Sequence, residues 1–195
     1  MDEGYIKFNC ERIPSDDIPL DKVAALNMYR EIMYNKGLIG MYPDGIGFGN
    51  ISIRCDENTF LISGTATGGI PVLDKSHYSL VTNYNLQTNR LICKGPINAS
   101  SESLTHALIY ESSPSTNAVI HIHNLALWNQ LMHKVPTSDN LVPYGTPEMA
   151  KEIKRLFEET SLSNEKIMVM GGHEEGIISF GKNLEEAANV LLEKL

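Results

Sequence analysis

Two histidines close an apolar run of the chain: His121 and His123 follow Val119 and Ile120 and enclose Ile122. Because successive side chains of a strand point to opposite faces, the two imidazoles share one face and the isoleucines share the other. Imidazole is the commonest protein ligand of divalent transition metals, and a catalytic zinc ion takes three protein ligands and keeps one position open. A solvated polar pair on a sheet face gives the same pattern, so a third ligand is needed to decide between the two interpretations.

The best candidate for a third ligand is His173, which follows Gly171 and Gly172 directly after a short apolar run. A residue at the glycine turn that ends a strand can project its side chain beyond the sheet edge into a cleft. His77 and His133 stand in polar stretches, and we expect them to be surface or packing residues.

A carboxylate that could exchange protons is found at Glu102, between Ser101 and Ser103 at a predicted helix start. An acid in a first helical turn is stabilised by the helix dipole and needs no further role, but a positioned carboxylate can also act as a general acid or base. His106 lies one turn further on the same face, so it could orient Glu102 or be an ordinary helix histidine. Both alternatives stay open for each residue.

Helices and hairpins must position these side chains. The periodicity predicts helices from residue 21 to a stop at Gly37, from about residue 101, over 125–132, over 147–157 and over 184–192. It predicts strands over 51–54 and 59–62 as one hairpin, over 117–123, and over 167–170 and 177–180 as a second hairpin. The mixed stretch up to Pro96 gives no clear element. Because neighbouring strands join in hairpins, the expected fold class is α/β with a mostly antiparallel sheet covered by helices.

The composition fits one compact domain over residues 1–195, with residues 1–19 as an extended N-terminal arm. The net charge of -8 argues against nucleic acid and membrane surfaces as partners, which favours a small-molecule substrate. Three widely spaced cysteines suggest neither a disulfide framework nor a zinc knuckle. The acidic start and the lack of an apolar run of about 20 residues lead us to expect a cytoplasmic protein.

Five short motifs occur in the order and approximate spacing of one family: Gly49-Asn50-Ile51-Ser52, Ser100-Ser101-Glu102, His121-Ile122-His123, Gly145-Thr146-Pro147-Glu148-Met149-Ala150 and Gly172-His173. From residue 21 to residue 195 the chain resembles the class II aldolase/adducin family, in particular proteins of the fuculose-phosphate aldolase type. This resemblance implies a three-layer α/β/α fold with a central, mostly antiparallel sheet. It also implies a homotetramer with its sites at subunit interfaces.

The resemblance assigns roles to individual residues. It implies a lyase that cleaves a phosphorylated hydroxy-carbonyl compound, a sugar phosphate, through an enediolate stabilised by a divalent metal, with Zn2+ as the expected ion. The implied metal ligands are His121, His123, His173 and Glu102, and Glu102 is also the implied catalytic acid and base. The implied phosphate pocket consists of neutral donors: Gly49, Asn50, Thr67, Gly68, Ser100 and Ser101. Ser63-Gly64 is an alternative to Thr67-Gly68.

The chain departs from the family pattern at the groups that would complete the reaction. Family aldolases carry a proton-donating tyrosine after the histidine strand, and Tyr144 is the one tyrosine in that segment. The usual His-Gly pair is replaced by His173-Glu174-Glu175-Gly176, which adds two carboxylates near the metal. A dehydratase or epimerase of the same family, or a non-enzymatic binding module like the adducin head, are therefore the alternative functions.

Overall fold

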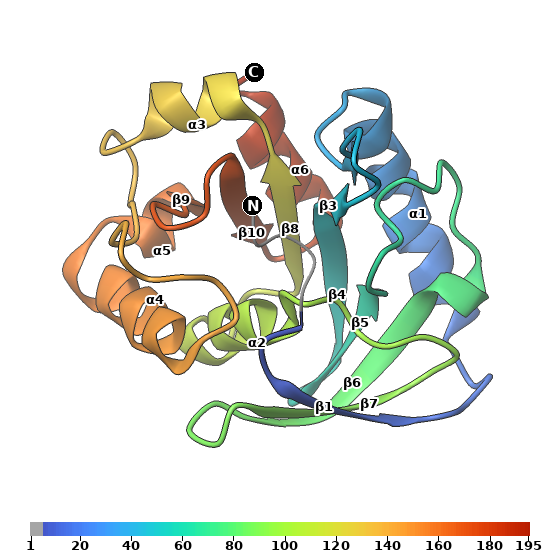
Figure 1. The fold of residues 1–195 in the computed structure, drawn as a ribbon. Helices are drawn as coiled ribbons and strands as arrows, with labels where there is room; N and C mark the ends of the chain where they lie inside the picture. The colour runs from blue at the N-terminus through green and yellow to red at the C-terminus, as the bar shows by residue number, and fades with distance from the viewer. Residues whose placement is uncertain (1–5) are drawn as a thin grey trace.

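The computed structural model describes residues 6–195, and a single curved sheet runs through this part of the chain (Figure 1). Its strand order is β1-β7-β6-β5-β4-β8-β10-β9, and every neighbouring pair is antiparallel except β1 with β7. The strands are β1 (Asn9–Ile13), β4 (Asn50–Asp56), β5 (Thr59–Ser63), β6 (Tyr78–Asn85), β7 (Arg90–Lys94), β8 (Ala118–His123), β9 (Ile167–Val169) and β10 (Gly176–Gly181). A separate two-stranded ribbon joins β2 (Gly40–Met41) to β3 (Gly47–Phe48).

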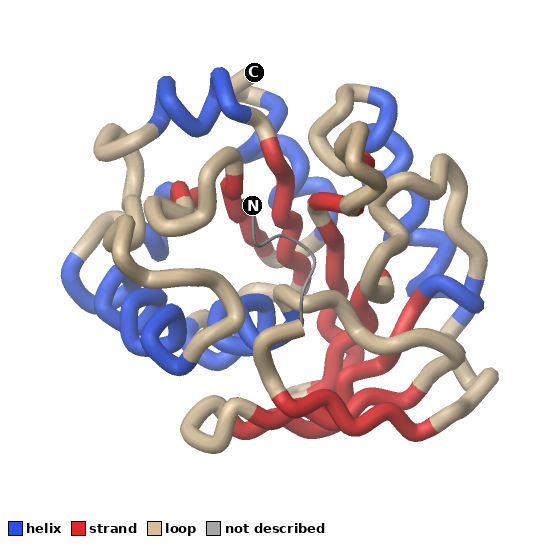
Figure 2. Tube along the Cα trace, viewed as in Figure 1, coloured by secondary structure: helices blue, strands red, loops and turns tan. Residues whose placement is uncertain are grey.

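Helices cover both faces of this sheet (Figure 2). The helices are α1 (Leu20–Asn35), α2 (Ser103–Ser112), α3 (Leu125–Leu131), α4 (Pro147–Glu159), α5 (Leu162–Glu165) and α6 (Leu184–Leu192). On one face α1 packs on β4, and α6 packs on β8 and β10; on the other face α2 and α4 lie side by side. The predicted α/β fold with three layers and a mostly antiparallel sheet is confirmed.

Two apolar cores separate the layers, and strand β8 shows how the alternation of side chains divides them. Ile120 and Ile122 pack into the core under α1, α3 and α6, whereas Val119 packs into the core under α2 and α4. His121 and His123 therefore face the α2 and α4 side, as the strand period requires. Both histidines are almost completely buried, so the solvated-pair interpretation of the motif is wrong.

The predicted helices and both predicted hairpins are present, with ends that differ by a few residues. Strands β6 and β7 occupy the stretch that gave no clear prediction. The reason lies in β6, where the register slips between Val81 and Asn83 and interrupts the regular alternation of buried and exposed residues.

The N-terminal segment adds a strand to the edge of the sheet, because β1 pairs with β7 in parallel register. Residues 1–5 of the expected arm lie outside the described residues. Within residues 6–195, no helix combines the length and apolar character that crossing a bilayer requires.

Candidate metal and anion site

The sheet register fixes the first two histidines. Strand β8 lies between β4 and β10, so that His121 stands opposite Asn50 on one side and Ile178 on the other. His123 stands opposite Gly176 at the end of the same ladder. A side chain on a central, fully paired strand has little freedom, since its backbone is held from both sides.

The third histidine comes from the turn between β9 and β10. The His173 amide donates to the Met170 carbonyl, the Gly176 amide donates to the His173 carbonyl, and the Met170 amide donates to the Gly176 carbonyl. A Cβ at Gly176 would collide with the His173 imidazole, so only glycine leaves room for that ring. The glycine turn therefore holds the His173 imidazole beside β8, the strand that carries the other two histidines.

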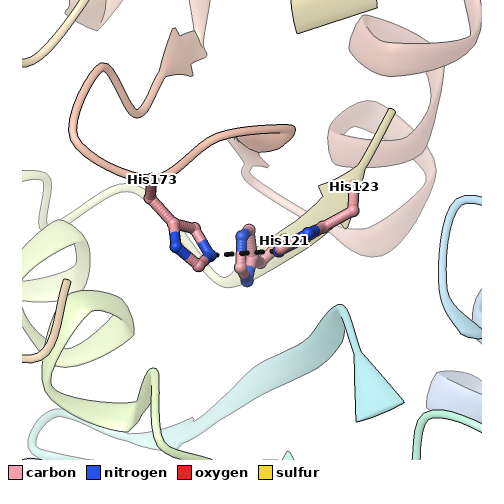
Figure 3. Close-up of side chains that lie close together, drawn as sticks. All are labelled: His121, His123 and His173. Atoms are coloured by element: carbon pink, nitrogen blue, oxygen red, sulfur yellow. Dashed lines mark hydrogen bonds between the residues drawn. The ribbon is translucent and has the colours of Figure 1, made fainter. Parts of the chain in front are cut away.

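The three imidazoles converge (Figure 3). One nitrogen from each of His121, His123 and His173 can be chosen so that all three atoms lie within 4.8 Å of one another. The Nε2 atoms of His123 and His173 are 3.1 Å apart. Two ligands on a tetrahedral zinc ion with Zn–N bonds of about 2.0–2.1 Å would be about 3.3 Å apart, so the spacing of this pair suits a shared metal ion.

Burial keeps these imidazoles in the neutral form that binds metals. It lowers the pKa of His121 and His123 well below the ordinary value, and the neighbouring imidazoles lower both further. Burial, followed by the positive charge of Lys7, lowers the pKa of His173 to about 4. Neutral imidazole has an unprotonated nitrogen that can bind a metal, so the site is ready for a cation near neutral pH.

His121 offers its Nε2 atom. Among the described residues this buried nitrogen has no hydrogen-bond partner, whereas Nδ1 lies 3.3 Å from the side-chain nitrogen of Asn50. The oxygen and nitrogen of an asparagine amide are assigned from their hydrogen bonds, and the Asn50 oxygen also lacks a partner here. Turning the amide over lets that oxygen accept from Nδ1–H, which leaves the Nε2 lone pair for a metal. An orphaned buried nitrogen of this kind fits a metal ligand.

His123 has partners that the sequence did not predict. Its Nδ1 atom is 2.9 Å from the hydroxyl of Tyr42, and this hydroxyl donates to Oε2 of Glu175 at 2.5 Å. Tyr42 lies in the turn that joins β2 to β3, a segment in which the sequence indicated only turns. Its partners follow 81 and 133 residues later, so no local pattern could reveal the contact.

A small polar pocket adjoins the histidines. All six residues of the predicted phosphate pocket line it, and Asn50 belongs to both regions. Gly64 of the alternative pair lines it too, whereas the Ser63 hydroxyl accepts from the Ile51 amide. The lining residues are Gly47, Gly49, Asn50, Gly64, Thr65, Ala66, Thr67, Gly68, Ser100 and Ser101. Neutral side chains and backbone amides of this kind suit an oxyanion.

Arg30 supports the loop that carries Thr67 and Gly68 of this pocket. Its guanidinium is almost fully buried and donates to the carbonyls of Thr67, Gly68 and Pro71. Burial lowers its pKa from the ordinary value for arginine. The sequence prediction overlooked Arg30, although its spacing from Leu26 and Met33 puts it on the buried stripe of α1.

Glu102 occupies the N-cap position of α2, directly after Ser101 of the pocket, and lies outside the compact group of three histidines. Its side chain is 1% exposed. His106, one turn further along α2, is completely buried, and its Nδ1 atom lies 2.7 Å from the Ser52 hydroxyl. Burial lowers the pKa of His106 to about 3.

The remaining candidates, Tyr144, His77 and His133, lie outside the group of three histidines. The Tyr144 ring is buried and packs against His173 with ring centroids 4.6 Å apart. His77 shares a capping box with Asp74 at a short helical turn, and His133 is exposed.

Comparisons with known proteins found relatives in sequence and in fold. The sequence profile of the Class II Aldolase and Adducin N-terminal domain matches residues 33–194. An L-fuculose phosphate aldolase of Methanococcus maripaludis is 29% identical over 161 residues, covering 75% of this chain and 79% of its own. The l-fuculose-1-phosphate aldolase of Thermus thermophilus superimposes with a TM-score of 0.63 at 20% identity, covering 89% of both chains. A sugar-phosphate aldolase from Thermotoga maritima gives 0.65 at 18% identity, covering 89% of this chain and 90% of its own.

Proposed function

The chain belongs to the class II aldolase and adducin N-terminal domain family, and from this premise we propose that it is a metal-dependent lyase acting on a sugar phosphate. The observation that carries the proposal is the convergence of three buried, neutral imidazoles beside a pocket of neutral oxyanion donors. A binding module would have no need to bury three histidines against one another. The names of the relatives point to ketose 1-phosphates as the first substrates to try.

The imidazoles of His121, His123 and His173 would hold the divalent cation, with zinc as the expected ion. Their donor set fits, since all three are nitrogen ligands kept neutral by burial and one of them has an orphaned Nε2 atom. When bound, the cation supplies Lewis acidity for the carbonyl and neighbouring hydroxyl of the substrate.

The residues of the chain itself position the substrate and move its proton. The anion pocket binds the phosphate, which places the carbonyl end of the substrate toward His121 through the shared residue Asn50. Glu102 removes a proton from the carbon next to the carbonyl in the direction of aldol synthesis, and returns it to that carbon in the direction of cleavage. In the direction of cleavage the hydroxyl group beside the breaking bond first loses its proton, and the carbon–carbon bond then breaks with release of an aldehyde. The proton that Glu102 delivers to the remaining fragment gives dihydroxyacetone phosphate, so that one proton is released and one is taken up.

The test is a metal analysis followed by an activity screen. We expect the purified chain to contain one divalent ion per subunit and to release dihydroxyacetone phosphate from one of a panel of ketose 1-phosphates, which a coupled dehydrogenase detects. Removal of the metal by a chelator should abolish release, and zinc should restore it. Light scattering tests the homotetramer that the resemblance to the family implies.

Other results would redirect the proposal. Bound metal together with isomerisation or water loss, in place of cleavage, would identify an epimerase or dehydratase. A chain that binds no divalent ion would contradict the proposal and favour a binding module.

A further inference from the structure

A chain of hydrogen bonds leads from the histidine group to a carboxylate. Tyr42 stands between His123 and Glu175, with its hydroxyl 2.9 Å from Nδ1 of the histidine and 2.5 Å from Oε2 of the glutamate. The tyrosine ring packs on Phe48 of the same ribbon, with centroids 4.5 Å apart, and the Phe48 ring packs on His123 at 5.4 Å. The Phe48 ring thus packs on the His123 imidazole, and Tyr42 contacts the same imidazole through its hydroxyl.

The number of hydrogen atoms fixes the direction of these bonds. A tyrosine hydroxyl has one hydrogen, and the Glu175 carboxylate is an acceptor. Because Tyr42 donates its hydrogen to Glu175, its oxygen accepts from His123, which must then carry its proton on Nδ1. The Nε2 atom of that tautomer is unprotonated, and this is the atom 3.1 Å from Nε2 of His173.

We propose that Tyr42 and Glu175 are positioning residues that hold His123 in the tautomer and orientation required for metal binding through Nε2. This inference rests on the proposed metal site. Hydrogen bonds from a ligand histidine to a second group orient the ring and raise its basicity, and their loss typically weakens metal binding about 10–100-fold.

The backbone supports this role for Glu175 over that of an ordinary turn residue. Glu175 has φ of +71°, a conformation that glycine adopts without strain and a glutamate does not. Its side chain is 20% exposed, whereas the preceding Glu174 is exposed. Glu175 thus occupies a strained backbone position while its carboxylate accepts from the Tyr42 hydroxyl. This combination indicates that the side chain has a role of its own.

Three variants separate positioning from folding. Y42F removes the hydroxyl and keeps the ring that packs on Phe48. E175G removes the carboxylate and relieves the positive φ, and it keeps the carbonyl that accepts from the Asn124 amide, so we expect the variant to fold. E174G is the matched control, because it makes the same substitution at the adjacent exposed residue.

The first measurement uses the metal-free chain, so that it does not depend on metal binding. Long-range proton–nitrogen correlation NMR distinguishes a protonated ring nitrogen from a bare one. In the wild type and in E174G we expect His123 to have a protonated Nδ1 and a bare Nε2, and in Y42F and E175G we expect a mixture of tautomers. A wild-type His123 with its proton on Nε2, or an unchanged His123 in both variants, would overturn the inference.

The second measurement is zinc affinity, by competition with a chromophoric chelator. We expect Y42F and E175G to bind zinc about 10–100-fold more weakly than the wild type, and E174G to bind as the wild type does. Equal affinity in all four chains would overturn the inference. A wild-type chain that binds no zinc, but shows the expected tautomer, would instead overturn the proposed function on which the inference rests.

Discussion

The two halves of the site are built in different ways. The histidine group lies on a central strand and on a tight turn, and its members are held by the ladder of β4, β8 and β10. The anion pocket is assembled from three loops that lie far apart in the sequence, and Arg30 ties one of them in place. The histidines thus depend on the hydrogen-bonded sheet and one turn, whereas the pocket depends on contacts between loops. We therefore expect a substitution in one half to impair metal binding or phosphate binding, but not both.

The largest effect is expected from the histidine half. H121A removes a ligand from the sheet, and we expect the purified variant to lose its metal and its turnover to fall to the background of the assay. Because the alanine fits a paired strand, the variant should fold and should still bind inorganic phosphate in the anion pocket. Metal analysis and phosphate titration check both halves, with H133A as the control at an exposed histidine. Loss of phosphate binding together with the metal would show that the halves are not separate.

Arg30 provides the opposite test. In R30M three carbonyl groups lose a buried charged donor, and we expect the free energy of unfolding to fall by about 3 kcal/mol. Phosphate binding should weaken, since the loop carrying Thr67 and Gly68 loses its support, while zinc stoichiometry should stay at the wild-type value. Urea unfolding and metal analysis measure these effects.

The control for R30M is R90M, which removes a half-exposed guanidinium paired with Glu11 at the sheet edge. Exposed pairs contribute about 0–1 kcal/mol, so this change should be small. If R30M were as mild as R90M, the support of the pocket would have to come from elsewhere.

The same division explains what the sequence could predict. The alternation of apolar and histidine residues in β8 and the glycine turn before His173 are local, so the three histidines could be found from residue chemistry alone. The pocket came only from the resemblance to the family, because its residues meet through the tertiary fold.

The missed residues are also those with distant partners. Tyr42 contacts His123 and Glu175 through the tertiary fold, and nothing in its neighbourhood indicates this. Arg30 carried a local signal, its helical spacing from Leu26 and Met33, but a charged residue is rarely fully buried, and that general expectation concealed it.

A third prediction concerns the pH dependence of the free energy of unfolding. His106, which packs behind the site against Ser52, has its pKa lowered to about 3 by burial, below the value of about 6.5 in an unfolded chain. Between these values the unfolded chain binds a proton that the folded chain does not. The free energy of unfolding of the metal-free chain should therefore fall as the pH falls, by about 1.4 kcal/mol per pH unit from His106 alone.

Urea unfolding of the wild type and H106Q at pH 5.5 and pH 4.5 checks this value. The glutamine does not titrate, so the variant should show a pH dependence weaker by that amount. An equal dependence in the two chains would show that His106 is protonated in the folded state, in conflict with its burial.

The smallest expected effect lies in the pocket. The Thr67 hydroxyl donates its one hydrogen to the Gly64 carbonyl at 2.8 Å, within the loop that Arg30 holds. T67V removes that bond, and we expect a loss of about 1 kcal/mol in the free energy of unfolding. Because the hydroxyl hydrogen is already used inside the loop, Thr67 supports the shape of the pocket more than it contacts the phosphate. The KM for a phosphorylated substrate should thus rise modestly while kcat is kept, as expected for a group that stabilises the bound substrate and the transition state equally. T82V is the matched control outside the pocket, because the Thr82 hydroxyl also donates to a main-chain carbonyl, that of Ile92. A fall in kcat with T67V alone would place Thr67 at the reacting end of the substrate.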